Sequence, residues 1–448
     1  MTAQPEHLLK AGQKLRIADG PGEALVVRYI KSGGQAEVYE TRVFDVPAAL
    51  KWYLPSYMPE DSGLWDRLER IILSPAPSAS FLWPYARVKD PRVAGFGYLM
   101  PLLPPGHISF NDLIYGNVDR SFQLLARIGF SVSNEIRRLH LEGLCYRDLN
   151  PGNFFYDAVS GQVDVLDNDN VDVDDDTTKA PALGVIEFAA PELLNQAARP
   201  SRYTDLWSLA VLLFHVTVLA HPLQGRRELR YASYDAARFD LHAKPLFIFD
   251  PTDDSNQPLD GVQGDNARVL WPFYPSALRD LFTRTFTEGI SRPSARATEG
   301  EWEEAFLRVA DSIFACPACG RENIVDFSGG AESQQCRFCG VPARRPATLR
   351  IDRWTIALQP GARVWRHHLE RQRDHEIDRL IAEVTEAPLR LRNLSGILWT
   401  AHREDGQVLT AAPGELLPLA ARLQIHFGPR SGHVEDGVRL TPGPGTRP

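Results

Sequence analysis

The order of the predicted elements limits most strongly how this chain can fold. Residues 1 to about 105 predict short strands, among them 25–30 and 36–39, because β-branched and aromatic residues dominate there. One helix at 62–73, with apolar residues at helical spacing, interrupts the strands. From Phe122 onward the pattern changes to long helices. A small strand-rich lobe followed by a large helical lobe is an unusual order, and it predicts an α+β fold.

Three long helices are predicted in the second lobe. Residues 122–140 carry one apolar stripe, whereas 203–220 are apolar nearly all round, which predicts a buried central helix. The third helix, 301–314, ends the lobe. The apolar run 206–220 contains polar residues and is shorter than the ~20 residues that a membrane span needs, so we expect no such span.

Composition excludes several function classes. Lys and Arg number 49 against 57 Asp and Glu, and this acidic balance argues against nucleic acid or an anionic membrane as the main partner. The N-terminal residues lack the basic and apolar regions of a signal peptide. Four of the five cysteines are closely paired, which suits a reducing compartment and a metal. We therefore expect a cytoplasmic protein.

A polar loop follows the first long helix. It contains Asp148 and Asn153, and Asp167 follows after a turn and a predicted strand at 163–166. An aspartate can accept a hydroxyl proton, and carboxylate and amide oxygens suit Mg²⁺, which prefers hard oxygen ligands. These three residues predict a site that combines a base with a metal.

At these residues the chain resembles the protein kinase superfamily, over roughly residues 20–314. The loop 146–153 is similar to the H-R-D-L-K-P-x-N motif, with Tyr146 and Asn150 in place of the His and the Lys. The resemblance implies a bilobal protein-kinase fold, with ATP and Mg²⁺ (or Mn²⁺) as cofactors. It also implies that Asp148 is the catalytic base.

The same resemblance implies metal ligands and a phosphate-binding lysine. Asn153 and Asp167 would hold Mg²⁺, and Asp167 matches the aspartate of the D-F-G motif. Lys51 matches the lysine of the V-A-I-K strand, so it would hold the α- and β-phosphates of ATP and pair with a helix glutamate. We expect Glu69 to be this catalytic partner, because its helix follows the lysine, and Asp66 is the competitor.

A nucleotide pocket is implied by two further segments. Residues 31–38 resemble the glycine-rich phosphate loop, with one of its three usual glycines in register. Residues 97–103 resemble the strand and hinge whose backbone would hydrogen-bond adenine. Besides Lys51, the residues implied in nucleotide binding are Gly33, Gly34, Val38, Ala49, Met100 and Leu102.

Three motifs match the large kinase lobe. Residues 190–192 match A-P-E, and 205–208 match the D-x-W-S helix start. Arg292 matches the arginine that pairs with the A-P-E glutamate, here Glu192. The resemblance further implies that Asp205 braces the backbone of the catalytic loop.

Three departures from the family motifs bear on whether the chain is an active kinase. Asn168 and Asp169 replace the Phe and Gly of D-F-G, and Asn150 replaces a lysine that contacts the γ-phosphate. We expect an active serine/threonine protein kinase, because the lysine, the base and both metal ligands are present. The alternatives are an ATP-binding pseudokinase adaptor and, on the same fold, an enzyme that phosphorylates a small molecule.

The segment between Asp167 and Glu192 permits three interpretations. It holds a run of aspartates followed by Thr177 and Thr178. One of the threonines would be autophosphorylated and pair with Arg147, or the aspartates already supply that negative charge. The third interpretation is a solvated acidic loop. Downstream, the long stretch 225–273 would dock a substrate or be an inert insertion.

The cysteines form two C-x-x-C-G knuckles separated by sixteen residues. This spacing is typical of a zinc ribbon, in which four thiolates hold a structural Zn²⁺ in a closed tetrahedral site. Redox dithiols or an iron site are the alternatives. We expect Cys145, in an apolar run, to be a buried packing residue. The expected Zn²⁺ ligands are Cys316, Cys319, Cys336 and Cys339.

Residues 346–440 predict short strands separated by turns, which is typical of a β-sandwich. They resemble the forkhead-associated (FHA) domain loosely, through 391–396 and a glycine–arginine pair at Gly361 and Arg366, although its Ser-x-x-His signature is not evident. A structural or partner-binding domain is the alternative to a phosphothreonine-binding one. An Arg-rich patch, 363–379, predicts a solvated helix face that includes His367, His368 and His375.

Five parts follow from these observations. They are a kinase small lobe (1–105), a kinase large lobe (106–314), a Cys₄ zinc ribbon (315–345), a small all-β FHA-like sandwich (346–440) and a disordered tail (441–448). This combination resembles bacterial kinases associated with tellurite-resistance-type (TerY) systems. That resemblance implies a protein substrate such as a von Willebrand A domain protein, and an opposing metal-dependent protein phosphatase.

Overall fold

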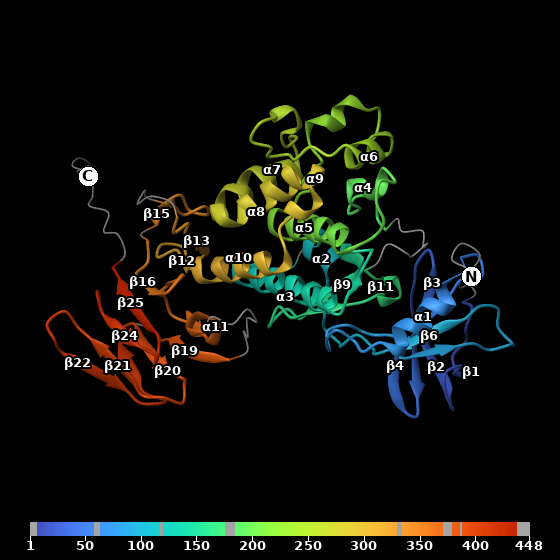
Figure 1. The fold of residues 1–448 in the computed structure, drawn as a ribbon, viewed down its shortest axis with the longest axis horizontal. Helices are drawn as coiled ribbons and strands as arrows, with labels where there is room; N and C mark the ends of the chain where they lie inside the picture. The colour runs from blue at the N-terminus through green and yellow to red at the C-terminus, as the bar shows by residue number, and fades with distance from the viewer. Residues whose placement is uncertain are drawn as a thin grey trace. The chain divides into compact units, whose positions relative to one another are not determined.

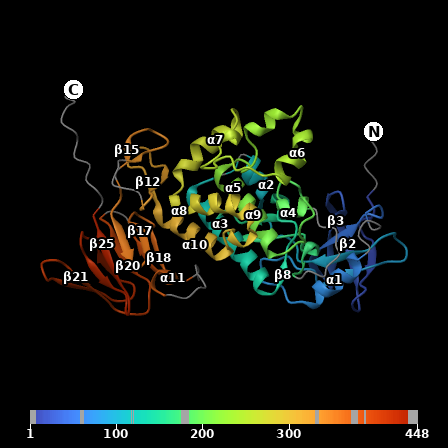
Figure 2. The same cartoon turned by 45° about the horizontal axis from the view of Figure 1, so that its top comes forward.

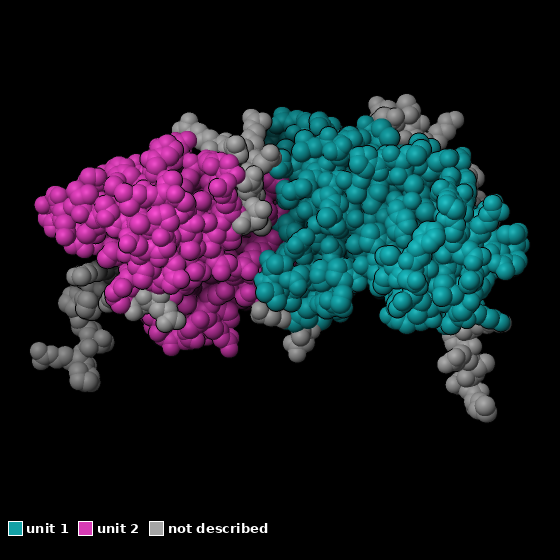
Figure 3. Space-filling model, turned by 90° about the horizontal axis from the view of Figure 1, so that it is seen from below, with its two compact units in different colours: residues 1–119, 131–267, 282–300 teal, residues 120–130, 268–281, 301–448 magenta. Residues whose placement is uncertain are grey.

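The computed structural model forms two compact units, drawn in teal and magenta in Figure 3. Unit 1 comprises residues 1–119, 131–267 and 282–300, and unit 2 comprises residues 120–130, 268–281 and 301–448. The structure describes residues 7–57, 63–116, 118, 120–174, 184–328, 334–343, 345–370, 379–385 and 388–436.

A six-stranded antiparallel sheet forms the N-terminal part of unit 1, drawn in blue in Figure 1, with the order β1-β2-β3-β4-β6-β5. The predicted strands at 25–30 and 36–39 lie within it and are confirmed. Side chains alternate along β4, so Leu50 and Trp52 enter one core cluster, and Ala49 and Tyr53 enter the other. The strands are β1 (Lys14–Arg16), β2 (Glu23–Ser32), β3 (Ala36–Val43), β4 (Val46–Tyr53), β5 (Ala86–Val88) and β6 (Gly97–Met100).

Helix α1 (Leu64–Leu73) packs on the sheet face that carries Ala49 (Figure 2). Leu64 and Leu68 lie one helical turn apart, so both point to the same side and enter the cluster with Ala49 and Tyr98. The helix predicted at 62–73 is therefore found, and it begins at Leu64.

The helical part of unit 1 contains α5 (Arg202–Val218), whose side chains from Thr204 to Val218 are all buried. Its apolar character on every side explains this burial, and the predicted central helix is confirmed. Ser201 and Thr204 form a capping box at its start. The other helices before the cysteine segment are α2 (Phe110–Tyr115), α3 (Phe122–Leu141), α4 (Pro191–Leu194), α6 (Tyr234–Ala243), α7 (Val262–Leu270), α8 (Ser276–Phe286), α9 (Glu288–Ser291) and α10 (Glu299–Ser312).

Short strands position two loops of unit 1. Strands β10 (Val163–Val165), β9 (Phe154–Tyr156) and β7 (Ile108–Ser109) form one small sheet, and β8 (Leu144–Cys145) pairs with β11 (Asp172–Val173). The loop 146–153 therefore runs from β8 to β9, and the turn 166–171 runs from β10 to β11. Cys145, in β8, is buried as expected.

Two antiparallel sheets share one core in the C-terminal part of unit 2 (Figure 2). Their orders are β17-β16-β25-β24-β21-β22 and β18-β19-β20-β23. Strand β21 begins at Trp399, because the preceding residues form a loop around the buried Asn393. The strands are β16 (Thr348–Ile351), β17 (Trp354–Ala357), β18 (Arg363–Trp365), β19 (Leu380–Val384), β20 (Arg390–Asn393), β21 (Trp399–His402), β22 (Val408–Ala411), β23 (Leu416–Pro418), β24 (Gln424–His426) and β25 (Ser431–Glu435).

Two small hairpins carry the cysteine segment. Strand β12 (Ile313–Ala315) pairs with β13 (Glu322–Ile324), and β14 (Gln334–Gln335) pairs with β15 (Pro342–Ala343). The helix predicted at 301–314 is too long, because α10 ends at Ser312 and the chain then enters β12. Within the described ranges, no helix is both long and apolar enough to cross a membrane.

The solvated helix face predicted in the Arg-rich patch is wrong for two of its three histidines. His367 and His368 lie on the short helix α11 (Arg366–Leu369) and are buried. His368 Nε2 lies 3.1 Å from Asp311 Oδ2, a partner on α10 that is distant in sequence and therefore invisible to a local pattern. His375 and the predicted disordered tail lie outside the described residues.

Candidate functional site

Asp205, at the start of α5, holds the backbone of the loop 146–153. Its Oδ2 accepts the N–H of Tyr146 at 2.6 Å, and its Oδ1 accepts the N–H of Arg147 at 3.1 Å. His140 Nε2, on α3, lies 3.0 Å from the same carboxylate. The brace expected from the sequence is therefore present, and it ties the loop to the buried helix of unit 1.

Two residues of the site adopt a left-handed backbone conformation that costs energy for any residue except glycine. Arg147 has a φ of 70°, and Asp167 has a φ of 54°. Arg147 Nε donates to the carbonyl of Asn170 at 2.6 Å, which joins the two segments at these strained positions. Such strain persists only where surrounding contacts enforce it, and it is concentrated at functional sites.

Asp148 accepts hydrogen bonds from three neighbours. Asn150 Nδ2 donates to its Oδ1 at 2.9 Å, Val185 N donates to Oδ1 at 3.3 Å, and Asn153 Nδ2 lies 3.3 Å from Oδ2. Burial raises the pKa of Asp148 above its ordinary value; the donated bonds oppose this rise, and the carboxylate of Asp167 adds to it. The side chain is thus fixed in direction and has a stronger affinity for a proton than a solvated aspartate.

The two asparagines of the loop divide their contacts differently. Asn150, which stands where the family has lysine, bonds to Asp148 and accepts the N–H of Gly152 at 2.9 Å. Asn153 Nδ2 donates to the carbonyl of Asp148 at 2.9 Å. Among the described residues no donor contacts Asn153 Oδ1. That oxygen and the partly exposed carboxylate of Asp167 are the hard donors that Mg²⁺ prefers, so the two residues fit this ion.

Lys51, on β4, is a buried cation between two carboxylates of the turn 166–171. Its Nζ lies 3.3 Å from Asp167 Oδ1 and 3.0 Å from Asp169 Oδ1. Burial by itself would lower the pKa of Lys51, but the two carboxylates outweigh burial and raise it above the ordinary value. The ammonium is therefore permanently charged at neutral pH, as a ligand for phosphate requires.

The expected pairing of Lys51 with Glu69 is wrong in this structure. Glu69 Oε1 instead lies 3.0 Å from Arg87 Nη2, and its side chain is 53% exposed. Asp66, the competitor, is exposed as well. The face of α1 that packs inward is set by Leu64 and Leu68, and it places Arg67 near the turn: Arg67 Nε donates to the carbonyl of Asp169 at 3.1 Å.

The residues expected to line a nucleotide pocket lie together. Val38, Ala49 and Met100 share one core cluster, with Leu102 packed against it. Leu102 and Leu103 form no main-chain hydrogen bond among the described residues, so the backbone groups of this expected hinge are available.

The expected phosphate loop is the turn between β2 and β3. Gly33 N donates to the carbonyl of Ala36 at 2.9 Å, which closes the turn. A side chain at Gly33 or Gly34 would meet nothing within 4 Å, and neither has a positive φ. The described conformation therefore does not itself require glycine at these two positions.

The arginine matched to the A-P-E glutamate is a different residue from the expected one. Arg296, which is fully buried, makes a two-pronged pair with Glu192, with Nη1–Oε1 at 2.7 Å and Nη2–Oε2 at 2.8 Å. Arg292 pairs with Glu288 at the surface. The turn 293–295 lies between the two arginines and places the buried one four residues after Arg292.

One acidic residue downstream of the turn contacts the loop 146–153. Asp172, in β11, lies 3.4 Å from Arg147 Nη1 and 3.8 Å from Arg70 Nη2 of α1. Thr177 and Thr178 lie outside the described residues. Past them, a small pocket beside Asp148 is lined by residues that include Gly184, Val185, Phe188 and Leu193.

Sequence reasoning missed Tyr53 and Tyr98, and it singled out Asp169 without predicting its contact with Lys51. The hydroxyls of Tyr53 and Tyr98 donate to the Asp169 carboxylate at 2.5 and 2.8 Å. A signal was available: Tyr53 lies two residues after Lys51 on one strand, and therefore on the same face, and Asp169 stands where the family has glycine.

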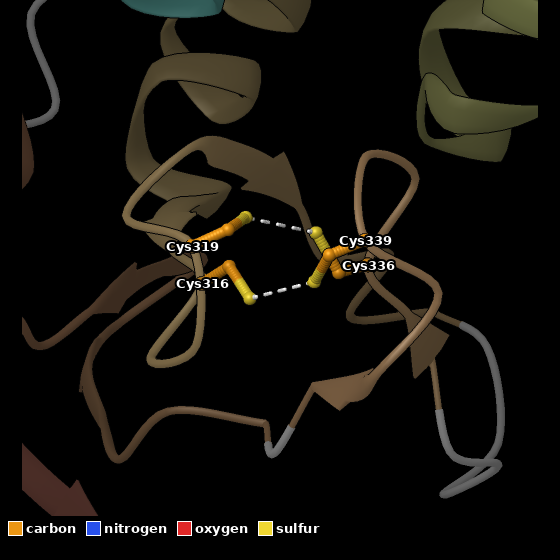
Figure 4. Close-up of side chains that lie close together, drawn as sticks. All are labelled: Cys316, Cys319, Cys336 and Cys339. Atoms are coloured by element: carbon orange, nitrogen blue, oxygen red, sulfur yellow. Dashed lines mark hydrogen bonds between the residues drawn. The ribbon is translucent and has the colours of Figure 1, made fainter.

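The four clustered cysteines converge from two similar loops (Figure 4). Cys316 Sγ lies 3.8 Å from Cys339 Sγ, and Cys319 Sγ lies 3.7 Å from Cys336 Sγ. Four thiolates about 2.3 Å from a tetrahedral Zn²⁺ would be about 3.8 Å apart, so the residues fit that ion. Gly320 and Gly340 have φ values of 72° and 69°, which each tight knuckle requires.

Comparison with known proteins identifies one segment. Residues 105–296 match the family model described as protein kinase domain. The chain is 36% identical over 93 residues to a putative ribosomal protein S6 kinase alpha-1 of Caenorhabditis elegans, covering 20% of this chain and 12% of that protein.

Two further relatives are similar over the same limited length. Ribosomal protein S6 kinase alpha-6 of Mus musculus is 34% identical over 90 residues, 20% of this chain and 12% of its own. The serine/threonine-protein kinase SCH9 of Candida albicans is 34% identical over 84 residues, 18% of this chain and 10% of its own. The chain thus spans about a tenth of the length of the curated relatives that it matches.

Proposed function

We propose, starting from the protein kinase domain at residues 105–296, that this chain is a serine/threonine protein kinase that transfers the γ-phosphate of ATP to a protein hydroxyl. One observation carries the proposal most directly. A buried ammonium, Lys51, lies 3.3 Å from Asp167 Oδ1, and the N–H of Leu166, next to Asp167, donates at 2.8 Å to the carbonyl of Asn153, whose side chain bonds to Asp148. A phosphate ligand, a metal ligand and a base therefore converge.

Each residue has a distinct task in this proposal. Lys51 binds and orients the phosphates through its permanent charge. Asp167 and Asn153 hold Mg²⁺, which when bound neutralises the charge that develops on the phosphates. Asp148 accepts the proton of the acceptor hydroxyl, and its raised pKa makes it a better proton acceptor than a solvated aspartate.

We also propose that the kinase does not require phosphorylation of Thr177 or Thr178 for activity, although it would autophosphorylate. A phosphate there would supply negative charge to Arg147. The carboxylate of Asp172 already lies 3.4 Å from Arg147 Nη1 and is buried. This favours the second of the interpretations drawn from the sequence, in which aspartates supply that charge.

We propose functions for the cysteine segment and for the C-terminal domain as well. The Cys₄ cluster holds a structural Zn²⁺, which reduced thiols in the cytoplasm would permit. The two-sheet domain binds a protein partner in the manner of an FHA-like module. As in the tellurite-resistance-type systems, the substrate would be a von Willebrand A domain protein, and a metal-dependent phosphatase would oppose the kinase.

The function is tested by incubating the full chain with Mg-ATP and a generic acceptor protein, followed by intact mass measurement and peptide mapping. We expect phosphate transfer by the wild type and a loss of about 10²–10⁴-fold in Asp148→Asn, the usual contribution of a general base. Asp253→Asn, which removes a carboxylate from an exposed turn, is the matched control. Near-normal turnover of Asp148→Asn would contradict the assignment.

An ATP-binding pseudokinase adaptor is the second candidate, and one contact favours it. Val185 N–H already donates to Asp148 Oδ1, so the base is occupied in this conformation. In that case the wild type would show a thermal shift with Mg-ATP but would phosphorylate neither itself nor the acceptor protein.

A further inference from the structure

The carboxylate of Asp169 is enclosed by three donor groups. Lys51 Nζ lies 3.0 Å from Oδ1 and 3.1 Å from Oδ2. The Tyr98 hydroxyl donates to Oδ1 at 2.8 Å, and the Tyr53 hydroxyl donates to Oδ2 at 2.5 Å. Each oxygen accepts one bond from the ammonium and one from a phenol, and the side chain is only 3% exposed. Lys51 therefore donates hydrogen bonds to both oxygens of one buried carboxylate.

The sheet holds one side of this arrangement. Lys51 and Tyr98 are direct partners across β4 and β6, and Tyr53 follows Lys51 by two residues on β4. All three side chains therefore leave the same face of adjacent antiparallel strands. Because strands of a sheet move little relative to one another, the two phenols fix where the carboxylate must lie.

The turn that carries Asp169 is held as well. Asn168, which replaces the phenylalanine of the D-F-G motif, is fully buried, and its Nδ2 donates to the carbonyls of Leu82 and Val165 at 3.0 Å each. Arg67 Nε donates to the carbonyl of Asp169 at 3.1 Å. Both departures from D-F-G therefore have a structural task in this turn.

Helix α1 contributes a cation to this region. Its inward residue near the turn is Arg67, while Glu69 pairs with Arg87 on β5. Asp66 forms no ion pair among the described residues. The carboxylates that pair with Lys51 therefore belong to Asp167 and Asp169, and none comes from α1.

We propose that Asp169 is the positioning residue that orients Lys51 toward the phosphates of ATP, in place of a carboxylate on α1. The inference rests on the proposed kinase function. Because Asp169 belongs to the same turn as Asp167, the lysine and a metal ligand are set by one rigid segment. Assembly of the site then does not depend on a movement of α1.

The rival role for Asp169 is that of an additional metal ligand. Both of its oxygens already accept two hydrogen bonds, and the carboxylate is almost completely enclosed. A metal would have to displace either the ammonium or a phenol. The two roles predict different responses to Mg²⁺ concentration, which the experiment below uses.

The test compares Asp169→Asn with Glu69→Gln in the full chain, by kcat and by KM for ATP. An amide cannot hold the ammonium with both oxygens, so we expect Asp169→Asn to raise KM for ATP and lower kcat/KM about 10²-fold, as for a misplaced reacting group. Glu69→Gln should leave both constants within about twofold, because its carboxylate binds Arg87. Unchanged constants in Asp169→Asn, or an equal loss in Glu69→Gln, would overturn the proposal.

A variant that merely folds poorly is distinguished by the same constants. Loss of folded protein lowers the apparent kcat and leaves KM for ATP unchanged, whereas a misplaced lysine raises KM. Tyr98→Phe is the second variant. It removes the hydroxyl that donates to Asp169 Oδ1, and it keeps the aromatic ring in its packing position. If Asp169→Asn does not fold, an unchanged KM in Tyr98→Phe would overturn the proposal, and a several-fold rise would support it.

Two further readouts separate this inference from the function on which it rests. The Kd for Mg-ATP, measured by calorimetry, reports whether Lys51 is oriented toward the phosphates. It does so even if the wild type transfers no phosphate and the proposed function fails. A weaker Kd in Asp169→Asn supports positioning, and an unchanged Kd opposes it. An increased Mg²⁺ requirement, with kcat restored at saturating Mg²⁺, would assign Asp169 to the metal instead and overturn the proposal.

Discussion

At the scale of the residue, hydrogen bonds and ion pairs with neighbouring groups fix the orientation of the side chains in the site. Asp148 has three donors, Lys51 has two carboxylates, and Asn153 keeps one oxygen without a donor among the described residues. Each motif residue therefore has its direction set by neighbours that no short motif includes. Positioning of this kind is the main source of rate enhancement in phosphoryl transfer.

The substitution Gly184→Ala tests the positioning of Asp148, because it adds a single atom, the Cβ, next to that side chain. A Cβ at residue 184 would clash with Asp148 Oδ1 and crowd the carbonyl of Arg147, and Asp148 can move only by losing its bond from Asn150. We expect Gly184→Ala to lower kcat about 10²-fold with KM for ATP unchanged. Steady-state kinetics with varied ATP checks this.

The matched control for Gly184→Ala is Gly300→Ala, because a Cβ at residue 300 in α10 meets nothing within 4 Å. It should turn over normally, and its thermal stability should not fall, since alanine favours a helix. An unaltered kcat in Gly184→Ala would show that the contact with Asp148 is not maintained during turnover.

At the scale of the element, the pairing of β8 with β11 brings Asp172 to the loop 146–153. Asp172 is the register partner of Cys145, two residues before Arg147. The same carboxylate lies 3.8 Å from Arg70, so it also reaches α1. One side chain thus links a strand pair, a loop and a helix.

Asp172→Asn should disrupt this link. We expect turnover to fall by about tenfold or more, because a hydrogen bond or ion pair to a buried charged group contributes about 1.5–3 kcal/mol. Asp174→Asn, whose parent carboxylate accepts the N–H of Arg202 at 3.1 Å, is the control and should lose little. Turnover that depends on phosphorylated Thr177 or Thr178, and not on Asp172, would contradict the proposed regulation; phosphatase treatment followed by assay decides this.

Prediction from sequence succeeded where an element depends on its own residues. The apolar stripe of α3, the apolar surface of α5 and the alternation in β2 and β3 are local patterns, and they appear as expected. It failed where a partner depends on how two elements face each other. Glu69 and Arg292 each had the right chemistry, but packing turned another residue, Arg67 or Arg296, into the interior.

At the scale of the whole molecule, two buried histidines of unit 1 give stability opposite pH dependences. Burial lowers the pKa of His140, but the carboxylates of Asp205 and Glu299 outweigh burial and raise it to about 9. Burial, together with nearby His242, lowers the pKa of His215 to about 4. The first histidine stabilises the fold when charged and the second when neutral.

The alkaline side of this prediction concerns His140. Its folded pKa exceeds the ordinary value of 6.5, so its stabilisation is complete below pH 6.5 and is lost as pH rises toward 9. The loss amounts to about 1.4 kcal/mol per pH unit, or roughly 3 kcal/mol in all. Urea unfolding at pH 6 and pH 9 should show a large stability difference between wild type and His140→Gln at pH 6 that shrinks at pH 9.

The acid side concerns His215, whose folded pKa lies below 6.5. Its stabilisation is complete above pH 6.5 and is lost as pH falls toward 4, because the unfolded chain then binds the proton that the folded chain excludes. The unfolding free energy of the wild type should therefore peak near pH 6.5. A stability that keeps rising above pH 8 would be incompatible with the assigned charge of His140.

Removal of metal tests the Cys₄ cluster in the intact chain. We expect one equivalent of Zn²⁺ by elemental analysis, and its loss in Cys336→Ser, with protease cleavage appearing around the cysteines, because so small a segment folds only with its metal. Cys145→Ala, which removes the buried fifth cysteine, is the control and should keep its Zn²⁺. Full metal content in Cys336→Ser would exclude the four-thiolate site.

The sequence by itself determined the kinds of element, their order and the identities of the chemical groups, because helix and strand periodicity and motif spacing are properties of neighbouring residues. It also predicted that four thiols would meet, because the two C-x-x-C-G pairs have the spacing typical of a zinc ribbon. Only the tertiary structure decided which carboxylate holds Lys51, which arginine holds Glu192 and which aspartate reaches Arg147. Those choices depend on the rotation of α1 and on the turns after β10 and α9, and packing between segments distant in sequence sets both.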